Sequence, residues 1–142
     1  MIENAAKGEN WMFRNLYAEV NGKGTDIAQN GRWSCAVFVS RILYLNKLIG
    51  DMHANVPSVT KDMLKSGWFE IKELKPGAVL VWEKRVALDD KTEHSHNGFY
   101  IGDGMAISND SKGTGFPHKH HYTYNGTRKI EKIYWHPALN ED

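Results

Sequence analysis

The sequence predicts an α+β fold in which helices precede an antiparallel sheet. Apolar residues repeat with helical spacing in the first half of the chain, whereas from residue 68 onward short segments rich in aromatic and β-branched residues alternate between turns. Such an order packs a helix on one face of a small curved sheet. The 142 residues have the length of one domain, 1–142. We therefore expect a single core.

The N-terminal part of the chain has the pattern of a helix followed by a loop. Residues 3–20 are amphipathic and carry Trp11 and Leu16 for packing. The segment Asn21-Gly22-Lys23-Gly24 is expected to end this helix, and a polar loop is expected from there to Trp33.

A second helix is predicted to begin at Ser34, which is a suitable N-cap, and to end before Gly50. Its apolar positions follow one another at intervals of four, three and four residues, which gives one buried stripe. The stripe consists of Phe38, Ile42, Leu45 and Ile49.

Pro57 fits the first turn of a third, shorter helix over residues 58–65. The remainder is predicted to be β-structure, with a charged loop at 84–93 and turns at Gly102-Asp103-Gly104 and Asn125-Gly126-Thr127, the latter as a hairpin. Strands are expected over residues 68–72, 78–83, 95–101, 105–108 and 128–135.

The composition favours neither a nucleic-acid nor a membrane partner. The 18 Lys and Arg residues nearly balance the 17 Asp and Glu residues. The longest apolar stretch, residues 36–49, is interrupted by polar side chains and is too short to span a membrane. The first fifteen residues lack the apolar segment of a signal peptide. If the substrate is cell wall, we expect export without a signal peptide of this chain's own, or as part of a longer protein.

The only cysteine, Cys35, lies where a polar loop passes directly into the second predicted helix. Unpaired amides and the helix dipole stabilise an anion at a helix start, and a cysteine there can have its pKa lowered below the free value of about 8.5. A deprotonated sulfur attacks carbonyl groups. This position is therefore suited to a nucleophile, although a single cysteine is also a common small core residue.

A partner histidine is available downstream in His94-Ser95-His96-Asn97-Gly98-Phe99-Tyr100, which alternates like a strand and ends in the predicted Gly-Asp-Gly turn. Gly98 leaves room beside the ring of His96, and Tyr100 shares its face of the strand. The returning strand, which begins at Met105, brings further polar residues alongside.

Three ordered motifs carry a family resemblance. They are the cysteine that opens a helix, the segment Lys75-Pro76-Gly77-Ala78-Val79-Leu80-Val81-Trp82, and the segment His96-x-Gly98-x-Tyr100-Ile101-Gly102-Asp103-Gly104. Together they resemble the NlpC-type and CHAP-type cell-wall peptidases and amidases of the papain-like superfamily. The likeness covers residues 30–110 and implies a papain-like core.

Position by position, the resemblance implies that Cys35 is the nucleophile and His96 the general base. For the third residue, which orients the imidazole, Asn109 has the best chemistry, Ser108 matches by strict count, and Asp110 is the next candidate. The run Ser34-Cys35-Ala36-Val37 departs from the family's usual Asp-Cys-Ser-Gly, which leaves the substrate specificity open.

Other residues compete for supporting roles. His94 shares the face of His96 and is a rival base, although it lies outside the His-x-Gly motif. Gln29, six residues before the cysteine, and Tyr17 are weak candidates for binding the oxyanion. The backbone amide of Cys35 is the better candidate for that role.

The segment His118-Lys119-His120-His121, together with His136, suggests a zinc site at first sight. No second pair of ligands with the usual spacing accompanies it, so we expect a solvated loop, with no metal and no cofactor. The alternative is that these histidines line a substrate cleft.

The function expected from these residues is that of a cysteine hydrolase that cleaves an amide bond in peptidoglycan stem peptides or between peptide and sugar. Its partner is thus a peptidoglycan or peptide substrate. Two alternatives stay open. One is a transglutaminase-like acyl transferase with Asp110 as the orienting group, and the other is a module that binds cell-wall peptides without turnover.

Overall fold

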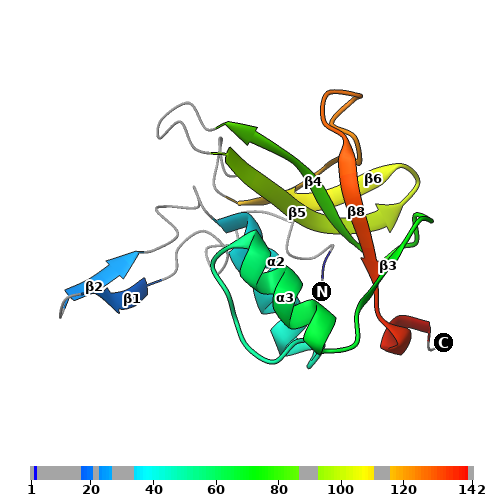
Figure 1. Cartoon of the computed structure of the whole chain (residues 1–142). Helices are drawn as coiled ribbons and strands as arrows, with labels where there is room; N and C mark the ends of the chain where they lie inside the picture. The colour runs from blue at the N-terminus through cyan, green and yellow to red at the C-terminus, as the bar shows by residue number, and fades with distance from the viewer. Residues whose placement is uncertain are drawn as a thin grey trace.

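The computed structural model describes residues 2, 17–20, 23–26, 34–86, 93–110 and 116–140. Two helices, α2 (Ser34–Leu45) and α3 (Val56–Lys65), lie in these ranges. Six strands form one antiparallel sheet in the order β3-β8-β4-β5-β6-β7, with the helices beside it (Figure 1). The predicted α+β class is confirmed. The strands are β3 (Phe69–Ile71), β4 (Val79–Val86), β5 (Glu93–Gly102), β6 (Met105–Asn109), β7 (Pro117–His121) and β8 (Ile130–Trp135), after which a 3₁₀ turn, η2 (Pro137–Asn140), follows.

Helix α2 begins at the predicted residue but ends four residues earlier than expected. Lys47 adopts the left-handed conformation, with φ of 59°. The N–H of Leu48 then donates to the carbonyl of Leu43 at 2.9 Å, which closes the helix in a Schellman motif without the usual glycine. Of the predicted stripe, Phe38, Ile42 and Ile49 are buried, whereas Leu45 is 55% exposed.

Helix α3 begins two residues earlier than predicted because Asn55 caps it. The side-chain oxygen of Asn55 accepts a hydrogen bond from the N–H of Ser58 at 2.9 Å, and Pro57 lies in the first turn as expected. Asp62 accepts a hydrogen bond from the N–H of Gly50 at 2.9 Å, which fastens the connection between α2 and α3.

The N-terminal prediction is wrong where the structure describes it. Residues 17–20 form a strand, β1 (Tyr17–Val20), which pairs with β2 (Lys23–Asp26) in a separate two-stranded sheet, in place of the helix and loop. The residues between these strands, Asn21 and Gly22, are the pair most typical of a two-residue hairpin, and this signal outweighs the helical periodicity. Residues 3–16 and 27–33 lie outside the described residues.

Strand β7 is the largest difference in the sheet, because its histidines were expected in a solvated loop. The strand pairs with β6 from Met105↔His121 to Asn109↔Pro117. Its polar sequence has no apolar alternation, and its first residue is proline, which an edge strand tolerates. Strands β4 and β5 also extend into the charged loop predicted at 84–93, of which residues 87–92 lie outside the described part.

Both predicted turns are present, but only one of them joins two strands that are neighbours in the sheet. Between β5 and β6, Asp103 and Gly104 have φ of 54° and 73°, as a tight two-residue hairpin requires. Asn125 and Gly126 also form a turn with positive φ. They connect β7 to β8, however, which are not neighbours in the sheet, so the predicted hairpin is wrong although the turn is right.

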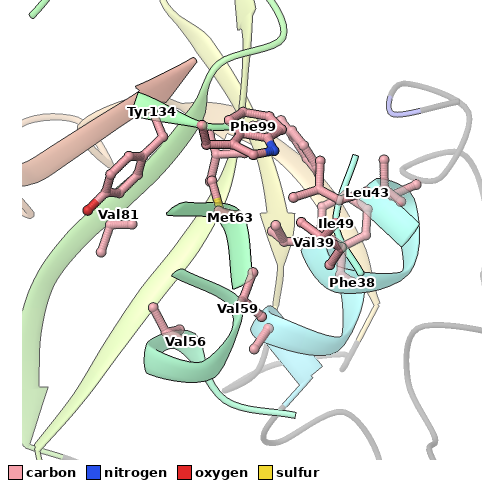
Figure 2. Close-up of a cluster of buried hydrophobic side chains, with 14 of the residues drawn as sticks. Phe38, Val39, Leu43, Ile49, Val56, Val59, Met63, Val81, Phe99 and Tyr134 are labelled. Carbon is pink, nitrogen blue, oxygen red and sulfur yellow. The ribbon is translucent and has the colours of Figure 1, made fainter. Parts of the chain in front are cut away.

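The main core fills the space between the helices and the sheet. Side chains from α2, α3 and the facing side of the sheet meet there, as Figure 2 shows. In its centre the ring of Phe38 contacts the ring of Phe99 edge-on at 5.5 Å. A second, smaller cluster on the other face of the sheet contains Leu80, Trp82, Tyr100 and Ala106. Because side chains alternate along a strand, β5 and β6 present different residues to the two clusters.

Candidate active site

Cys35 is the second residue of α2, and its thiol faces the backbone of β5. The backbone N–H groups of Asn97, Ala36 and Cys35 itself act to lower the pKa of the thiol, as does the positive charge of Arg128. Unpaired amides at a helix start are thus gathered around the sulfur, as the sequence suggested.

Burial nevertheless raises the pKa of the Cys35 thiol, and this effect outweighs the lowering by the amides and by Arg128. The expected lowering of the pKa is therefore wrong in direction. Its physical reason is that a charged sulfur loses its hydration in the protein interior, which disfavours the thiolate. The thiol is protonated near neutral pH and needs a base when it attacks.

Alkylation of the native protein should report this burial. We expect the rate of reaction of Cys35 with iodoacetamide to rise with pH and to reach its midpoint above the free-thiol pKa of about 8.5. The chain has one cysteine, so the modified mass reports this site alone, and the protein unfolded in urea supplies the control profile. A native midpoint below that of the unfolded chain would contradict the raised pKa.

His96 lies on β5 immediately before Asn97, whose backbone N–H acts to lower the pKa of the Cys35 thiol. Its side chain is buried, and its ring packs on Trp82 with a centroid distance of 5.2 Å. The thiol of Cys35 packs against the main core, whereas the ring of His96 packs on Trp82, which belongs to the second cluster on the other face of the sheet. The rival base His94 lies two residues earlier, opposite Arg85 on β4, and its carbonyl oxygen accepts a hydrogen bond from Arg128 at 3.4 Å.

Ser108 is the third-residue candidate that the structure brings to His96. The Nε2 atom of His96 lies 2.9 Å from the Oγ atom of Ser108. Asn109 follows on β6 and by alternation faces the side of Ile107, in the core beneath the helices. Asp110 lies beyond the end of β6, where its N–H donates to the carbonyl of Phe116 at 2.9 Å.

Sequence reasoning missed the two further partners of Ser108. Its Oγ atom lies 2.7 Å from Nε2 of His120 and 2.8 Å from the hydroxyl of Tyr124. The rings of His120 and Tyr124 stack at 4.0 Å with an angle of 15°. The spacing of two residues between His118 and His120 was the available signal, because it puts both side chains on one face of a strand. Only the pairing of β7 with β6, in which His118 lies opposite Ser108, brings that face to Ser108.

Burial controls the protonation of both groups. It lowers the pKa of His120 to about 4 and raises the pKa of Tyr124 to about 12. At neutral pH His120 is therefore an uncharged ring, and Tyr124 keeps its hydroxyl proton.

Trp82 supports this group of rings from β4. Its indole Nε1–H donates to the carbonyl of Tyr122 at 2.7 Å, and its ring lies 5.6 Å from His120 and 5.4 Å from Tyr124. With no exposed surface, Trp82 fixes the depth at which the ring of His96 lies.

Two more residues next to the thiol were not predicted. Asn97 is fully buried, and neither atom of its side-chain amide has a hydrogen-bond partner among the described residues. Arg128 donates from Nη2 to the carbonyl of Glu83 at 2.8 Å, which holds its charge beside β4. Of the oxyanion candidates, Gln29 lies outside the described residues, and only the backbone of Tyr17 is described, in β1.

The other histidine considered for zinc lies elsewhere. Nε2 of His136 lies 2.8 Å from the carbonyl of Ser66, after α3. In the ranges that the structure describes, no three His, Cys, Asp or Glu residues are grouped as metal ligands. Nor does any helix in those ranges have the length and apolarity needed to cross a membrane.

No protein-family model matches the chain, and a search of curated proteins finds no match.

Proposed function

We propose that this protein is a cysteine hydrolase that cleaves an amide bond through an acyl-enzyme, in peptidoglycan stem peptides or at the amide between peptide and sugar. The observation that carries the proposal is that α2, which has Cys35 in its first turn, packs on β5, the strand that carries His96. A papain-like core, with the cysteine helix packed on the sheet beside the histidine strand, belongs to the same proposal.

In the proposed reaction the thiol is protonated before attack, and His96 acts as its general base, which requires the imidazole to reach the sulfur from the face of β5 that carries it against Trp82. The sulfur of Cys35 forms a bond to the substrate carbonyl carbon while its proton passes to the imidazole. The C–N bond then breaks, and the imidazolium gives that proton to the leaving amine. Water, deprotonated by the same ring, attacks the thioester, the C–S bond breaks to release the carboxylic acid, and the imidazolium returns its proton to the sulfur.

The backbone N–H of Cys35, which lies at the start of α2, is the proposed donor to the oxyanion. Such a group stabilises charge that develops on the carbonyl oxygen, and its place is fixed before the reaction. The nearby charge of Arg128 supports the same step.

We assign the orienting role to Ser108 in place of Asn109. The distance of 2.9 Å between Ser108 Oγ and His96 Nε2 supports this, together with the alternation that directs Asn109 to the other face of β6. A hydroxyl can hold an imidazole in one orientation, although it does not carry the charge that a carboxylate would.

A digest of purified peptidoglycan, with the soluble products analysed by mass, tests the function. We expect new fragments in which one amide has gained a molecule of water, and their masses identify the bond. A parallel digest with an added primary amine distinguishes an acyl transferase, whose products would carry the amine. Intact peptidoglycan in both digests would contradict the proposal.

The raised pKa of Cys35 favours a second candidate, a module that binds cell-wall peptides without turnover. Such a module would be retained on insoluble peptidoglycan without releasing fragments, and replacement of Cys35 by alanine would leave that retention unchanged.

A further inference from the structure

The hydroxyl of Ser108 has three partners, and its single proton can serve only one of them. His96 Nε2, His120 Nε2 and the Tyr124 hydroxyl lie 2.9, 2.7 and 2.8 Å from Ser108 Oγ. A serine hydroxyl offers one donor and two acceptor positions. Two of the three partners must therefore donate to Ser108, and one must accept from it.

The environment of His120 decides which partner accepts. Its Nδ1 atom lies 2.7 Å from the carbonyl oxygen of His121, which can only accept, so Nδ1 carries a proton. Because burial keeps the ring uncharged at neutral pH, Nε2 of His120 has no proton. Ser108 must donate its proton to that nitrogen.

The other two partners are then donors. Tyr124, whose pKa burial raises to about 12, donates its hydroxyl proton to Ser108 Oγ. His96 must likewise donate from Nε2. In an uncharged imidazole the second nitrogen, Nδ1, is then the basic atom.

We propose that His120 is a positioning residue which, through Ser108, holds His96 in the tautomer with its proton on Nε2 and its basic lone pair on Nδ1. If the acceptor at His120 is lost, the Ser108 proton becomes available to His96 Nε2, and the ring can shift its own proton to Nδ1. That tautomer cannot take the proton of a thiol at Nδ1. The catalytic consequence rests on the proposed function, whereas the tautomer itself does not.

Nuclear magnetic resonance of the native protein tests the first part without any substrate. In long-range ¹H–¹⁵N correlation spectra of histidine-labelled protein near neutral pH, protonated and unprotonated ring nitrogens resonate far apart. We expect the uncharged ring of His96 to carry its proton on Nε2, and His120 to carry its proton on Nδ1. A proton on Nδ1 of His96, or on Nε2 of His120, would overturn the proposal.

Two replacements of His120 separate hydrogen bonding from packing. His120→Phe keeps an aromatic ring against Tyr124 but removes the acceptor, and His120→Gln keeps an acceptor oxygen. His118→Gln is the matched control, because it removes a histidine from the same strand at a ring distance of 4.9 Å from His120. We expect His120→Phe to move His96 toward the Nδ1–H tautomer, while His120→Gln and the control keep the native tautomer.

Peptidoglycan turnover supplies the second readout. In the His120→Phe variant kcat/KM should fall by about 10-fold to 100-fold, because general-base catalysis contributes about 10²-fold to 10⁴-fold and only part of it is lost. His120→Gln should restore most of the lost kcat/KM.

An unchanged His96 tautomer in His120→Phe would overturn the proposal. If His120→Phe does not fold, the native spectrum and His120→Gln still decide. Absence of turnover in every variant, with the tautomers as expected, would contradict the hydrolase and leave the role of His120 intact.

Discussion

Replacement of Cys35 by alanine is expected to abolish hydrolysis of peptidoglycan and to leave the fold nearly unchanged. Removal of a catalytic nucleophile lowers turnover by about 10⁴-fold or more, because the covalent intermediate is formed on that atom. The thiol is partly buried at the first turn of α2 and contributes little packing, so the free energy of unfolding should change by about 1 kcal/mol or less.

The measurements are the rate of fragment release from peptidoglycan and the midpoint of thermal unfolding. Cys35→Ser provides the conservative comparison, since it keeps the shape of the side chain but supplies a much weaker nucleophile. Retained turnover in both variants, combined with a large loss of thermal stability, would identify Cys35 as a structural residue and contradict the hydrolase.

The parts of the site that follow from local sequence could be predicted. Ser34 begins α2 as expected, since a capping residue before an apolar run is a short-range signal. The hairpin that joins β5 to β6 is equally local, because Asp103 and Gly104 must both adopt positive φ. These two features place the candidate nucleophile and the candidate base on the right elements.

The surroundings of the base depend on pairing between distant segments and could not be predicted. Strand β7 is stabilised by its register with β6, not by an apolar pattern of its own, so its histidines resembled a solvated loop. The residue that orients the imidazole could not be chosen from the sequence for the same reason. Only the alternation of β6 within the sheet separates Ser108, which faces Trp82, from Asn109.

The pKa of Cys35 shows why a local signal can give the wrong direction. The helix start supplies the amides that the sequence predicts, but the degree of burial is a property of the whole fold. The pairing of β1 with β2 is a second case in which a local signal predicted the wrong structure. Residues 17–20 fit an amphipathic helix by periodicity, yet they pair with residues 23–26 in a two-stranded sheet.

Gly98 is expected to be the residue at which the smallest substitution has the largest effect on the fold. A Cβ atom at this position would lie 2.6 Å from the carbonyl oxygen of Ile107, 2.7 Å from Cβ of Ser108 and 3.1 Å from the Trp82 ring. The first two contacts belong to β6 itself, so they can be relieved only by separation of β5 from β6. Crowding of this kind costs about 3 kcal/mol.

The Gly98→Ala variant should therefore unfold at a lower urea concentration and lose turnover, because Ser108 is displaced from His96. Gly50→Ala is the matched control, since its Cβ atom would lie at an ordinary distance of 3.4 Å from the Asp62 carboxylate and its φ is not positive. It should change the free energy of unfolding by less than about 1 kcal/mol. Urea unfolding followed by tryptophan fluorescence measures both variants. Equal stabilities would show that β5 and β6 can separate without loss, and that the close approach at Gly98 does not hold Ser108 against the ring of His96.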